Sequence, residues 1–312
     1  MARVIFMGTP QFAVPALRVL LSHHDVVAVV TQPDAPAGRG RALSPSPVKA
    51  LAVEWGAPVL QPESLKSPEA VDQLRACAPE VIVVAAFGQI LRRPVLELPP
   101  HGCVNVHASL LPRWRGASPI NAAIAAGDAV TGITIMRMDA GLDTGPILSQ
   151  RSEPIRPDDT AGALGARLAE LGAALLVETL PGYLAGRIQP QPQDDTRATK
   201  CGLLKKEDGR IDWQRSAIEI ERHVRAMSPW PSAFTTWQGR LLRVLRAAVH
   251  PTDTPALPPG AVFIAGKSIC VRCGEDALEL IEVQPEGKRP MSGVDFARGQ
   301  RGLPGSRFGS GD

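Results

Sequence analysis

The sequence lacks features that several classes of protein require. Cysteine is scarce, with five in 312 residues, and although Cys270 and Cys273 form a C-x-x-C pair, no second pair stands at zinc-site spacing. No run of about 18 apolar residues occurs, which argues against a membrane-spanning helix. The stretch MARVIFMGTP lacks the pattern of a signal peptide. We therefore expect a cytoplasmic protein with reduced thiols, no metal and no membrane association.

The motifs of two large enzyme classes are also missing. The first predicted strand ends at Gly8-Thr9-Pro10 rather than in G-x-G-x-x-G, so a bound dinucleotide is disfavoured, and Pro10 marks a helix start. No nucleophile elbow with a Ser-His-Asp or Cys-His arrangement is found. We interpret Cys103 as a core residue. A covalent intermediate on an enzyme nucleophile is therefore not expected.

The length and composition indicate a globular protein of about two domains. Apolar residues make up 44% of the chain and charged residues 21%, which suits a sizeable core. Residues 1–204 contain 18 basic and 18 acidic residues, whereas residues 205–312 contain 16 and 13, so the net charge of +3 lies in the second part. A mildly basic second domain is compatible with a polyanionic partner.

The first part of the chain has the alternating strands and helices of an α/β domain. Apolar runs at 3–8 and 26–31 predict buried strands on either side of a helix over 10–22, which is the βαβ unit of a parallel sheet. Further strands are predicted at 81–86, 104–108 and 132–138, and further helices at 47–56, 68–77, 117–127 and 160–187. We place this domain at residues 1–189.

A change in composition separates a second domain from the first. Residues 189–200, QPQPQDDTRATK, are polar and have no hydrophobic period, so we expect a linker over residues 190–204. A helix is predicted at about 216–227, followed by short strand-like runs that Gly and Pro interrupt. This pattern is typical of a small β-barrel or sandwich, which we place at residues 205–312.

The triplet Asn105-Val106-His107 is the main candidate for chemistry. Side chains two apart on a strand point to the same face, so Asn105 and His107 can face one reacting group. An amide NH₂ can donate to a developing oxyanion, and an imidazole can move protons near neutral pH. By itself N-x-H is a weak pattern, because a histidine at a strand end is often structural.

Three further segments each follow a predicted strand. In open parallel sheets ligands bind beyond the carboxyl ends of the strands, so the Pro- and Arg-containing loop 109–120 is expected to line a crevice. Two glycines bracket Asp143 in the turn 139–146, where a carboxylate can orient His107. Residues 87–91, FGQIL, offer backbone groups and an apolar wall for a flat heteroaromatic ring. The alternatives are a plain connection, a solvated turn and core residues.

These residues resemble the folate-dependent formyltransferases. The run NVHASLLPRWRGASPINAAI, followed by GLDTG, is the first match, and IFMGTPQFAVPAL, TQPDAPAGRGRALSPSPVKALA and DWQRSAIEIERHVRAMSPWPSAFT are others. The resemblance extends from about residue 3 to about residue 300. It implies a Rossmann-like formyltransferase domain with a parallel sheet and an OB-like β-barrel, with 10-formyltetrahydrofolate as donor and the α-amine of methionyl-initiator-tRNA as acceptor.

The resemblance and the residues together give a proposed site. Direct attack by the amine suffices for a formyl group, with Asn105 on the oxyanion, His107 on the proton and Asp143 orienting the imidazole. We expect folate to contact two loops and the turn before Asp143. The expected folate contacts are Phe87, Gly88, Gln89, Ile90, Leu91, Ser109, Leu110, Leu111, Pro112, Asp139 and Gly141.

Basic residues in two regions are candidates for tRNA contact. The long Pro- and Gly-rich segment 33–47 suits a functional loop, and arginine binds phosphate in a two-pronged geometry. In the family this loop enters the acceptor stem, and Arg39 aligns with its key arginine. In the second domain Arg240, Arg243 and Arg246 are three apart, so on a regular strand they would alternate faces. The expected tRNA contacts are Arg39, Arg41, Lys49, Lys205, Lys206, Arg240 and Arg243.

Other functions remain open from the sequence. A sugar-nucleotide N-formyltransferase or a formyltetrahydrofolate hydrolase shares the N-x-H and Asp centre, and a non-catalytic RNA-binding protein would need only the second domain. No partner motif is found, so we expect a monomer.

We predict that Arg39→Ala lowers kcat/KM for the full tRNA more than for a short aminoacyl mimic. An arginine that binds the acceptor stem can contribute only when the substrate contains that stem. Steady-state kinetics with both acceptors measures this difference. Equal losses on the two acceptors would argue against a tRNA role for Arg39.

Overall fold

The computed structural model describes residues 1–37, 42–252, 257–300 and 302–309. The chain forms two compact units, which we describe one at a time. Unit 1 comprises residues 1–119, 130–154 and 165–201, and unit 2 comprises residues 120–129, 155–164 and 202–312. The segment expected to be a linker, 190–204, thus belongs to unit 1 as far as Cys201.

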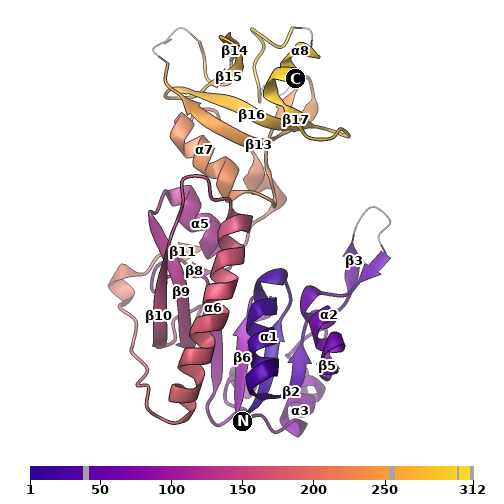
Figure 1. Cartoon of the computed structure of the whole chain (residues 1–312), viewed down its shortest axis with the longest axis vertical. Helices are drawn as coiled ribbons and strands as arrows, with labels where there is room; N and C mark the ends of the chain where they lie inside the picture. Colours follow the sequence, from indigo (N-terminus) through magenta and orange to yellow (C-terminus); the bar gives the residue numbers. More distant parts are fainter. Residues whose placement is uncertain (38–41, 253–256, 301, 310–312) are drawn as a thin grey trace. The chain divides into compact units, whose positions relative to one another are not determined.

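A seven-stranded sheet forms the centre of unit 1 (Figure 1). Its strands are β1 (Arg3–Gly8), β2 (Asp25–Val30), β5 (Val59–Leu60), β6 (Val81–Ala85), β7 (Cys103–His107), β9 (Val130–Arg137) and β10 (Ile147–Pro154). The order across the sheet is β10-β9-β7-β6-β1-β2-β5. The five strands from β7 to β5 run parallel, whereas β9 is antiparallel to β7 and β10 is antiparallel to β9.

The predicted α/β class is confirmed, and the predicted strands lie within about two residues of the observed ones. The sequence pattern predicted a strand at 132–138 without a direction, and the structure shows this strand, β9, antiparallel to β7. The prediction missed β10, in which exposed polar and less exposed residues alternate as in a strand with one solvated face. Antiparallel strands at one side of a mostly parallel sheet are common. Hydrophobic periodicity does not report strand direction, so the sequence pattern could not distinguish the two arrangements.

Helices cover both faces of this sheet. They are η1 (Gln11–Ala13), α1 (Val14–His23), α2 (Pro47–Glu54), α3 (Pro68–Ala76), α4 (Arg93–Leu96) and α6 (Ala161–Leu184). Ser46 and Ser67 cap α2 and α3 by accepting backbone N–H groups. Two short strand pairs complete the unit, β3 (Ala35–Ala37) with β4 (Ala42–Ser44) and β8 (Arg115–Gly116) with β11 (Lys200–Cys201).

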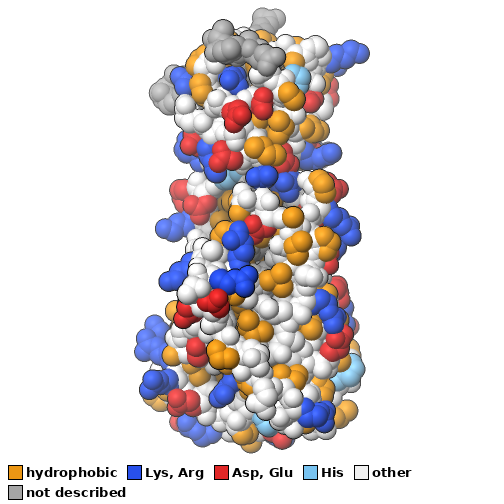
Figure 2. Space-filling model, turned by 90° about the vertical axis from the view of Figure 1, so that its left-hand side faces the viewer, with side chains coloured by type: hydrophobic (Ala, Val, Ile, Leu, Met, Phe, Trp, Pro, Cys, Tyr) orange, Lys and Arg blue, Asp and Glu red, His pale blue; other side chains and the backbone are white. Residues whose placement is uncertain are grey.

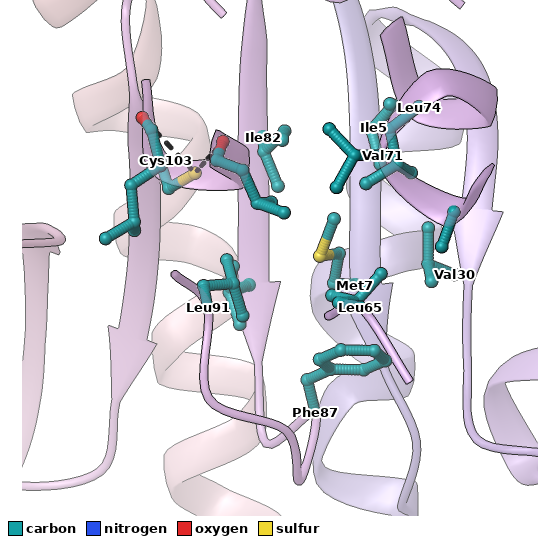
Figure 3. Close-up of a cluster of buried hydrophobic side chains, with 14 of the residues drawn as sticks. Ile5, Met7, Val30, Leu65, Val71, Leu74, Ile82, Phe87, Leu91 and Cys103 are labelled. Atoms are coloured by element: carbon teal, nitrogen blue, oxygen red, sulfur yellow. Dashed lines mark hydrogen bonds between the residues drawn. The ribbon is translucent and has the colours of Figure 1, made fainter. Parts of the chain in front are cut away.

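A buried cluster fills the face of the sheet that α3 and α4 cover (Figure 3). Ile5 and Met7 of β1 and Ile82 and Val84 of β6 contribute to it, because side chains two apart on a strand point to the same face. Cys103 of β7 lies in the same cluster, and burial raises the pKa of its thiol to about 12. Cys103 is therefore a protonated core residue, as the sequence indicated.

Helix α6 packs on the opposite face at a close approach. A Cβ on Gly172 would lie 2.8 Å from Cγ1 of Val106 on β7 and 3.6 Å from Cδ1 of Ile133 on β9. Val106 alternates with Asn105 and His107, so these two polar residues point away from α6. The helix therefore fixes which face of β7 carries the polar side chains.

Unit 2 is built on an antiparallel sheet. Its strands are β12 (Ala233–Trp237), β13 (Arg240–His250), β14 (Val262–Ala265), β15 (Ser268–Arg272), β16 (Ala277–Pro285) and β17 (Met291–Ser292). They pair in the order β12-β13-β16-β15-β14, and β17 pairs with β16. Its other elements are α5 (Pro119–Ala126), which begins at the last residue of a unit 1 segment, η3 (Lys206–Gly209), α7 (Ala217–Ala226) and α8 (Gly293–Arg298). A second domain of short β-strands is thus confirmed.

A reciprocal cap begins helix α7. The Ser216 hydroxyl accepts the backbone N–H of Glu219, and the Glu219 carboxylate accepts the backbone N–H of Ser216 at 3.0 Å. Its hydrogen bonds to Ser216 and Arg215 lower the pKa of Glu219 to about 2. The sequence S-x-x-E is the expected signature of such a cap, so the helix start agrees with the prediction at about 216.

Among the residues that the structure describes, no helix is both long and apolar enough to cross a membrane. In the same residues no group of three or more His, Cys, Asp and Glu side chains is arranged to hold a metal ion.

We predict that Gly172→Val lowers the free energy of unfolding by about 1–3 kcal/mol, because the new side chain overlaps Val106 and forces the helix away from the sheet. Urea unfolding followed by circular dichroism measures the change. Ala174→Val is the matched control, since Ala174 is exposed on the same helix and should lose less than about 1 kcal/mol from helix propensity. Equal losses in the two variants would contradict a close approach at Gly172.

Candidate active site

Strand β7 brings two polar side chains to one face of the sheet. Asn105 is 9% exposed and His107 is 6% exposed, and both are among the few buried polar residues of unit 1. Asn105 lies beside Met136 and His107 beside Thr134 on β9. The predicted strand, and the shared face that it implies, are therefore present. A buried polar group needs a partner, so the contacts of each side chain define its role.

The imidazole of His107 lies between a carbonyl oxygen and a carboxylate. Its Nε2 is 3.0 Å from the backbone oxygen of Trp114, and its Nδ1 is 3.7 Å from Oδ2 of Asp143. Since a carbonyl oxygen can only accept, Nε2 has the proton and donates it to Trp114. Nδ1 is then the nitrogen that can take up a proton. The 3.7 Å separation exceeds a direct hydrogen bond and suits an ion pair or a bridging water.

Asp143 is fixed by its own loop and by its neighbours. Its carboxylate is 14% exposed, and Oδ2 accepts the backbone N–H of Gly116 at 2.8 Å. Its φ is 51°, a left-handed conformation that Asp tolerates better than most residues but that neighbouring contacts must maintain. The structure therefore brings Asp143 to His107, as the sequence predicted.

The Asn105 side chain forms no hydrogen bond with any residue that the structure describes. Its amide is nevertheless largely buried, on the same face of β7 as His107. An amide NH₂ that has no protein partner is available to an acceptor oxygen brought by a ligand. This arrangement is what an oxyanion donor requires.

The loop after β7 is bound to β9. The Thr134 hydroxyl donates to the backbone oxygen of Ser109 at 2.6 Å and accepts the backbone N–H of Leu111 at 3.0 Å. The Ser109 hydroxyl donates to the backbone oxygen of Arg113 at 2.6 Å. The segment Ser109–Pro112, an expected folate contact, is thus held rigidly next to the strand end that bears His107.

The segment 87–91 contributes less side-chain surface than expected. Phe87 and Leu91 are 2% and 5% exposed and pack into the core cluster of Figure 3. These two side chains therefore cannot be part of the apolar surface that we expected to contact the ligand, because they belong to the buried core on one face of the sheet. Ile90 is 81% exposed, and Gly88 has a φ of 87° that favours glycine. What the segment offers a ligand is Ile90 and its backbone.

The side chain of Gln89 is engaged within unit 1. Its Oε1 accepts the backbone N–H of Leu65 at 3.0 Å, and its Nε2 donates to the backbone oxygen of Pro62 at 3.3 Å. Gln89 therefore attaches the 87–91 segment to the loop before α3, and its contact with folate stays a prediction.

The turn before Asp143 is held by one carboxylate. Asp139 Oδ1 accepts the backbone N–H of Gly141 at 3.0 Å and the hydroxyl of Thr144 at 2.7 Å. A Cβ on Gly141 would lie 2.0 Å from Oγ1 of Thr144, so a larger residue would open the turn. The two expected folate contacts in this turn thus shape the loop that presents Asp143.

The segment that we expected to be a linker instead packs on the active-site loop. Thr199 accepts the backbone N–H of Trp114 on its hydroxyl at 2.9 Å and the backbone N–H of Arg115 on its carbonyl at 2.9 Å. Lys200 and Cys201 then pair with Arg115 and Gly116 as a two-strand ladder. No sequence signal identified these contacts, because polar composition is the same in a packed segment and a free one.

Gly116 shows how tightly this segment approaches. Its φ is 119°, and a Cβ there would lie 2.0 Å from the carbonyl oxygen of Cys201. Burial raises the pKa of the half-buried Cys201 thiol. The thiol is therefore a neutral neighbour of the site rather than a nucleophile.

Of the candidate tRNA contacts in unit 1, the structure describes only Lys49. Arg39 and Arg41 lie outside the described residues. Lys49 Nζ is 2.6 Å from Oδ2 of Asp34, and the hydrogen bonds from Lys49 and Gln61 lower the pKa of Asp34. Lys49 is thus engaged in a half-buried ion pair that would have to open for it to bind a phosphate.

The candidates in unit 2 are exposed. Lys205, Lys206, Arg240 and Arg243 are open to solvent. An irregularity of the β13 ladder falls between Val244 and Arg246, and Arg246 is exposed as well, so the simple alternation expected for three arginines does not hold. On the face shown in Figure 2, Lys and Arg side chains are interspersed with acidic and hydrophobic ones rather than gathered into one patch.

Comparison with known proteins gives this geometry a family. The formyl transferase model matches residues 2–180, and the model of the formyl transferase C-terminal domain matches residues 203–301. The chain belongs to the formyl transferase family. The resemblance found in its motifs is thereby confirmed.

Two relatives in the family are similar over almost their whole length. The methionyl-tRNA formyltransferase of Chloroflexus aggregans is 54% identical over 302 residues, which cover 95% of this chain and 97% of that protein. The protein of the same name from Methylococcus capsulatus is 51% identical over 309 residues, which cover 99% of this chain and 100% of that protein. Within the formyl transferase family, the chain therefore groups with the methionyl-tRNA formyltransferases.

A solved structure shares the fold. The N-formyltransferase from Helicobacter canadensis, in complex with folinic acid and dTDP-3-aminofucose, has a TM-score of 0.67 and covers 91% of this chain and 100% of that chain. The sequence identity is 17%, so this likeness concerns the fold alone.

Proposed function

We propose that this formyl transferase transfers the formyl group of 10-formyltetrahydrofolate to the α-amino group of methionyl-initiator-tRNA. The observation that carries the proposal is the identity of 54% and 51% to methionyl-tRNA formyltransferases over nearly the full chain. The placement of Asn105, His107 and Asp143 supports it, because an amide donor, a base and a carboxylate are what formyl transfer needs.

The reaction is a direct displacement. The amine nitrogen forms a bond to the formyl carbon, and the C=O electrons move onto oxygen to give a tetrahedral oxyanion. The bond to the folate nitrogen then breaks as the oxyanion collapses, and one proton passes from the attacking amine to the leaving nitrogen. Atoms and charges balance without an enzyme-bound acyl group, which agrees with the protonated state of the Cys103 and Cys201 thiols.

Asn105 is proposed to donate to the formyl oxygen as negative charge develops. Its amide has no protein partner among the described residues, and the hydrogen bond is strongest in the transition state because the formyl oxygen gains negative charge there.

His107 is proposed to move the proton through Nδ1. Its Nε2–H is engaged by the carbonyl of Trp114, so Nδ1 is the free nitrogen. When Nδ1 takes the proton of the amine, Asp143 Oδ2 at 3.7 Å stabilises the resulting imidazolium. A water molecule between His107 Nδ1 and Asp143 Oδ2 can then pass the proton on to the folate nitrogen.

Folate is proposed to bind along the loops that follow β6 and β7. Ser109, Leu110, Leu111 and Pro112 are next to His107, and the turn containing Asp139 and Gly141 is next to Asp143. On the β6 side we retain Gly88, Gln89 and Ile90, with backbone contacts only from Phe87 and Leu91.

The tRNA is proposed to contact Lys205, Lys206, Arg240 and Arg243, whose exposure supports this role, and Arg39, Arg41 and Lys49 by family resemblance. All three catalytic residues come from one chain, so we propose that a monomer is sufficient. Since the acceptor is an initiator tRNA, we place the enzyme in the cytoplasm.

A formyl-transfer assay with methionyl-tRNA and 10-formyltetrahydrofolate is predicted to give one formylmethionyl-tRNA per tetrahydrofolate released. Matched reactions contain folate alone, or a nucleotide-linked amino sugar in place of the tRNA. Folate turnover without an acceptor would indicate a hydrolase, and formylation of the sugar would indicate the sugar-nucleotide alternative. Binding of tRNA without any turnover would indicate a non-catalytic RNA-binding protein.

Removal of the Asn105 donor is predicted to lower kcat/KM by about 10²–10³-fold, the usual effect of losing one oxyanion donor. Asn105→Ala tests this in the same assay, and Asn105→Asp keeps the size of the side chain but has no NH₂ to donate. Both should lose at least about tenfold while the thermal melting temperature stays near that of the wild type. Near-normal turnover of Asn105→Ala would remove Asn105 from the mechanism.

A further inference from the structure

Gln193 links the two loops that hold His107. Its Oε1 accepts Nε and Nη2 of Arg115 at 3.0 and 2.8 Å. Its Nε2 donates to the backbone oxygens of Asp143 and Gly145 at 2.8 and 2.7 Å. One side chain from the supposed linker thus joins the loop of Trp114–Gly116 to the loop of Asp143.

The orientation of the Gln193 amide follows from its partners. A guanidinium can only donate and a carbonyl oxygen can only accept, so Oε1 must face Arg115 and Nε2 must face the Asp143 loop. Both N–H donors and the amide oxygen are then used. A glutamate at this position could still accept from Arg115 but could not donate to the two carbonyl oxygens.

The buried guanidinium of Arg115 holds the segment that contains Gln193 in place. Arg115 is 4% exposed, and a buried cation is stable only with close partners. Its other partner is Asp195, whose Oδ1 is 2.6 Å from Nη2 although the Asp195 side chain is 81% exposed. Both partners belong to residues 193–195, so the burial of Arg115 holds this segment in place.

The link acts on Asp143 through the backbone. Asp143 has a φ of 51°, and its carboxylate is positioned by the N–H of Gly116 at 2.8 Å. Gly116 adjoins Arg115, and Trp114 on its other side supplies the carbonyl for His107 Nε2. Gln193 therefore helps to fix both the Asp143 carboxylate and the Trp114 carbonyl that binds His107. A displacement of such groups by about 1 Å can lower a reaction rate by up to 10²-fold.

We infer that Gln193 is a positioning residue for formyl transfer: by joining Arg115 to the backbone of Asp143 it sets the distance between the Asp143 carboxylate and His107. The inference rests on the proposed function, because formyl transfer is the reaction whose rate the test measures. It assigns a catalytic-site role to a segment, 193–201, whose sequence indicates only a polar connection.

The test compares Gln193→Ala, Gln193→Glu and Gln191→Ala in the full chain. Gln191→Ala is the matched control, because the Gln191 side chain is exposed and bonds only the nearby backbone oxygen of Gln189. We expect Gln193→Ala and Gln193→Glu to lower kcat about tenfold, with KM for both substrates changed less than about threefold. Gln191→Ala should behave as the wild type.

The glutamate variant separates positioning from stability. If Gln193 served only to accept the N–H groups of buried Arg115, a carboxylate would replace it well, and Gln193→Glu would be as active as the wild type. If it positions Asp143, Gln193→Glu fails like Gln193→Ala even where its thermal melting temperature is unchanged. Wild-type kcat in Gln193→Glu therefore overturns the inference.

A double-mutant cycle with Asp143→Asn gives the second measurement. Once the carboxylate is gone, a residue that acts through it has little left to contribute, so adding Gln193→Ala should lower kcat by less than about twofold. An additive loss would overturn the inference. Wild-type protein that does not formylate methionyl-tRNA refutes the proposed function instead, so the two failures are distinguishable.

Discussion

The candidate active site depends on one hydrogen bond, from His107 Nε2 to the carbonyl oxygen of Trp114 at 3.0 Å. Strand β7 is buried along its whole length, so an imidazole at its end needs a polar partner on the protein side. The Trp114 carbonyl meets that need at a φ of 60°, and Thr199 holds the Trp114 backbone N–H at 2.9 Å. Because this bond occupies Nε2, the proton exchange is left to Nδ1, which faces Asp143. In the proposed mechanism, the conformation of one loop thus decides which nitrogen of the ring exchanges the proton.

The sequence predicted what local patterns control. The period of two placed Asn105 and His107 on one face of a strand, and the structure shows both on the face opposite to α6. The two glycines around Asp143 predicted a tight turn, and one is found in which Asp139 binds Gly141 and Thr144. The segment 87–91 shows the limit of such reasoning. Its apolar residues suit a ligand-binding surface and a hydrophobic core equally well, and in the structure Phe87 and Leu91 belong to the core.

Long-range partners explain what the sequence did not reveal. Gln193 binds residues 50 and 78 positions away, and no periodicity or composition reports on contacts of that kind. The burial of Arg115 was equally hard to predict. Arginine is mostly exposed in proteins, and Arg115 is buried here because of partners that lie much later in the sequence. The direction of β9 belongs to the same class, because a buried strand has the same hydrophobic pattern in either direction.

The chemistry and the choice of acceptor are separable in this fold. In the proposed mechanism Asn105, His107 and Asp143 address only a formyl group and an amine, so the same trio would suit an amino sugar or an aminoacyl end. The Helicobacter canadensis N-formyltransferase shares the fold. Discrimination must therefore come from residues away from the formyl carbon. Exposed cations such as Lys205 and Arg243 favour a polyanion through its phosphates, which gives affinity that depends on salt but little sequence preference. Recognition of one tRNA among many consequently needs contacts to its bases as well, and the sequence of residues 33–47, which contains two arginines, offers side chains suited to make them.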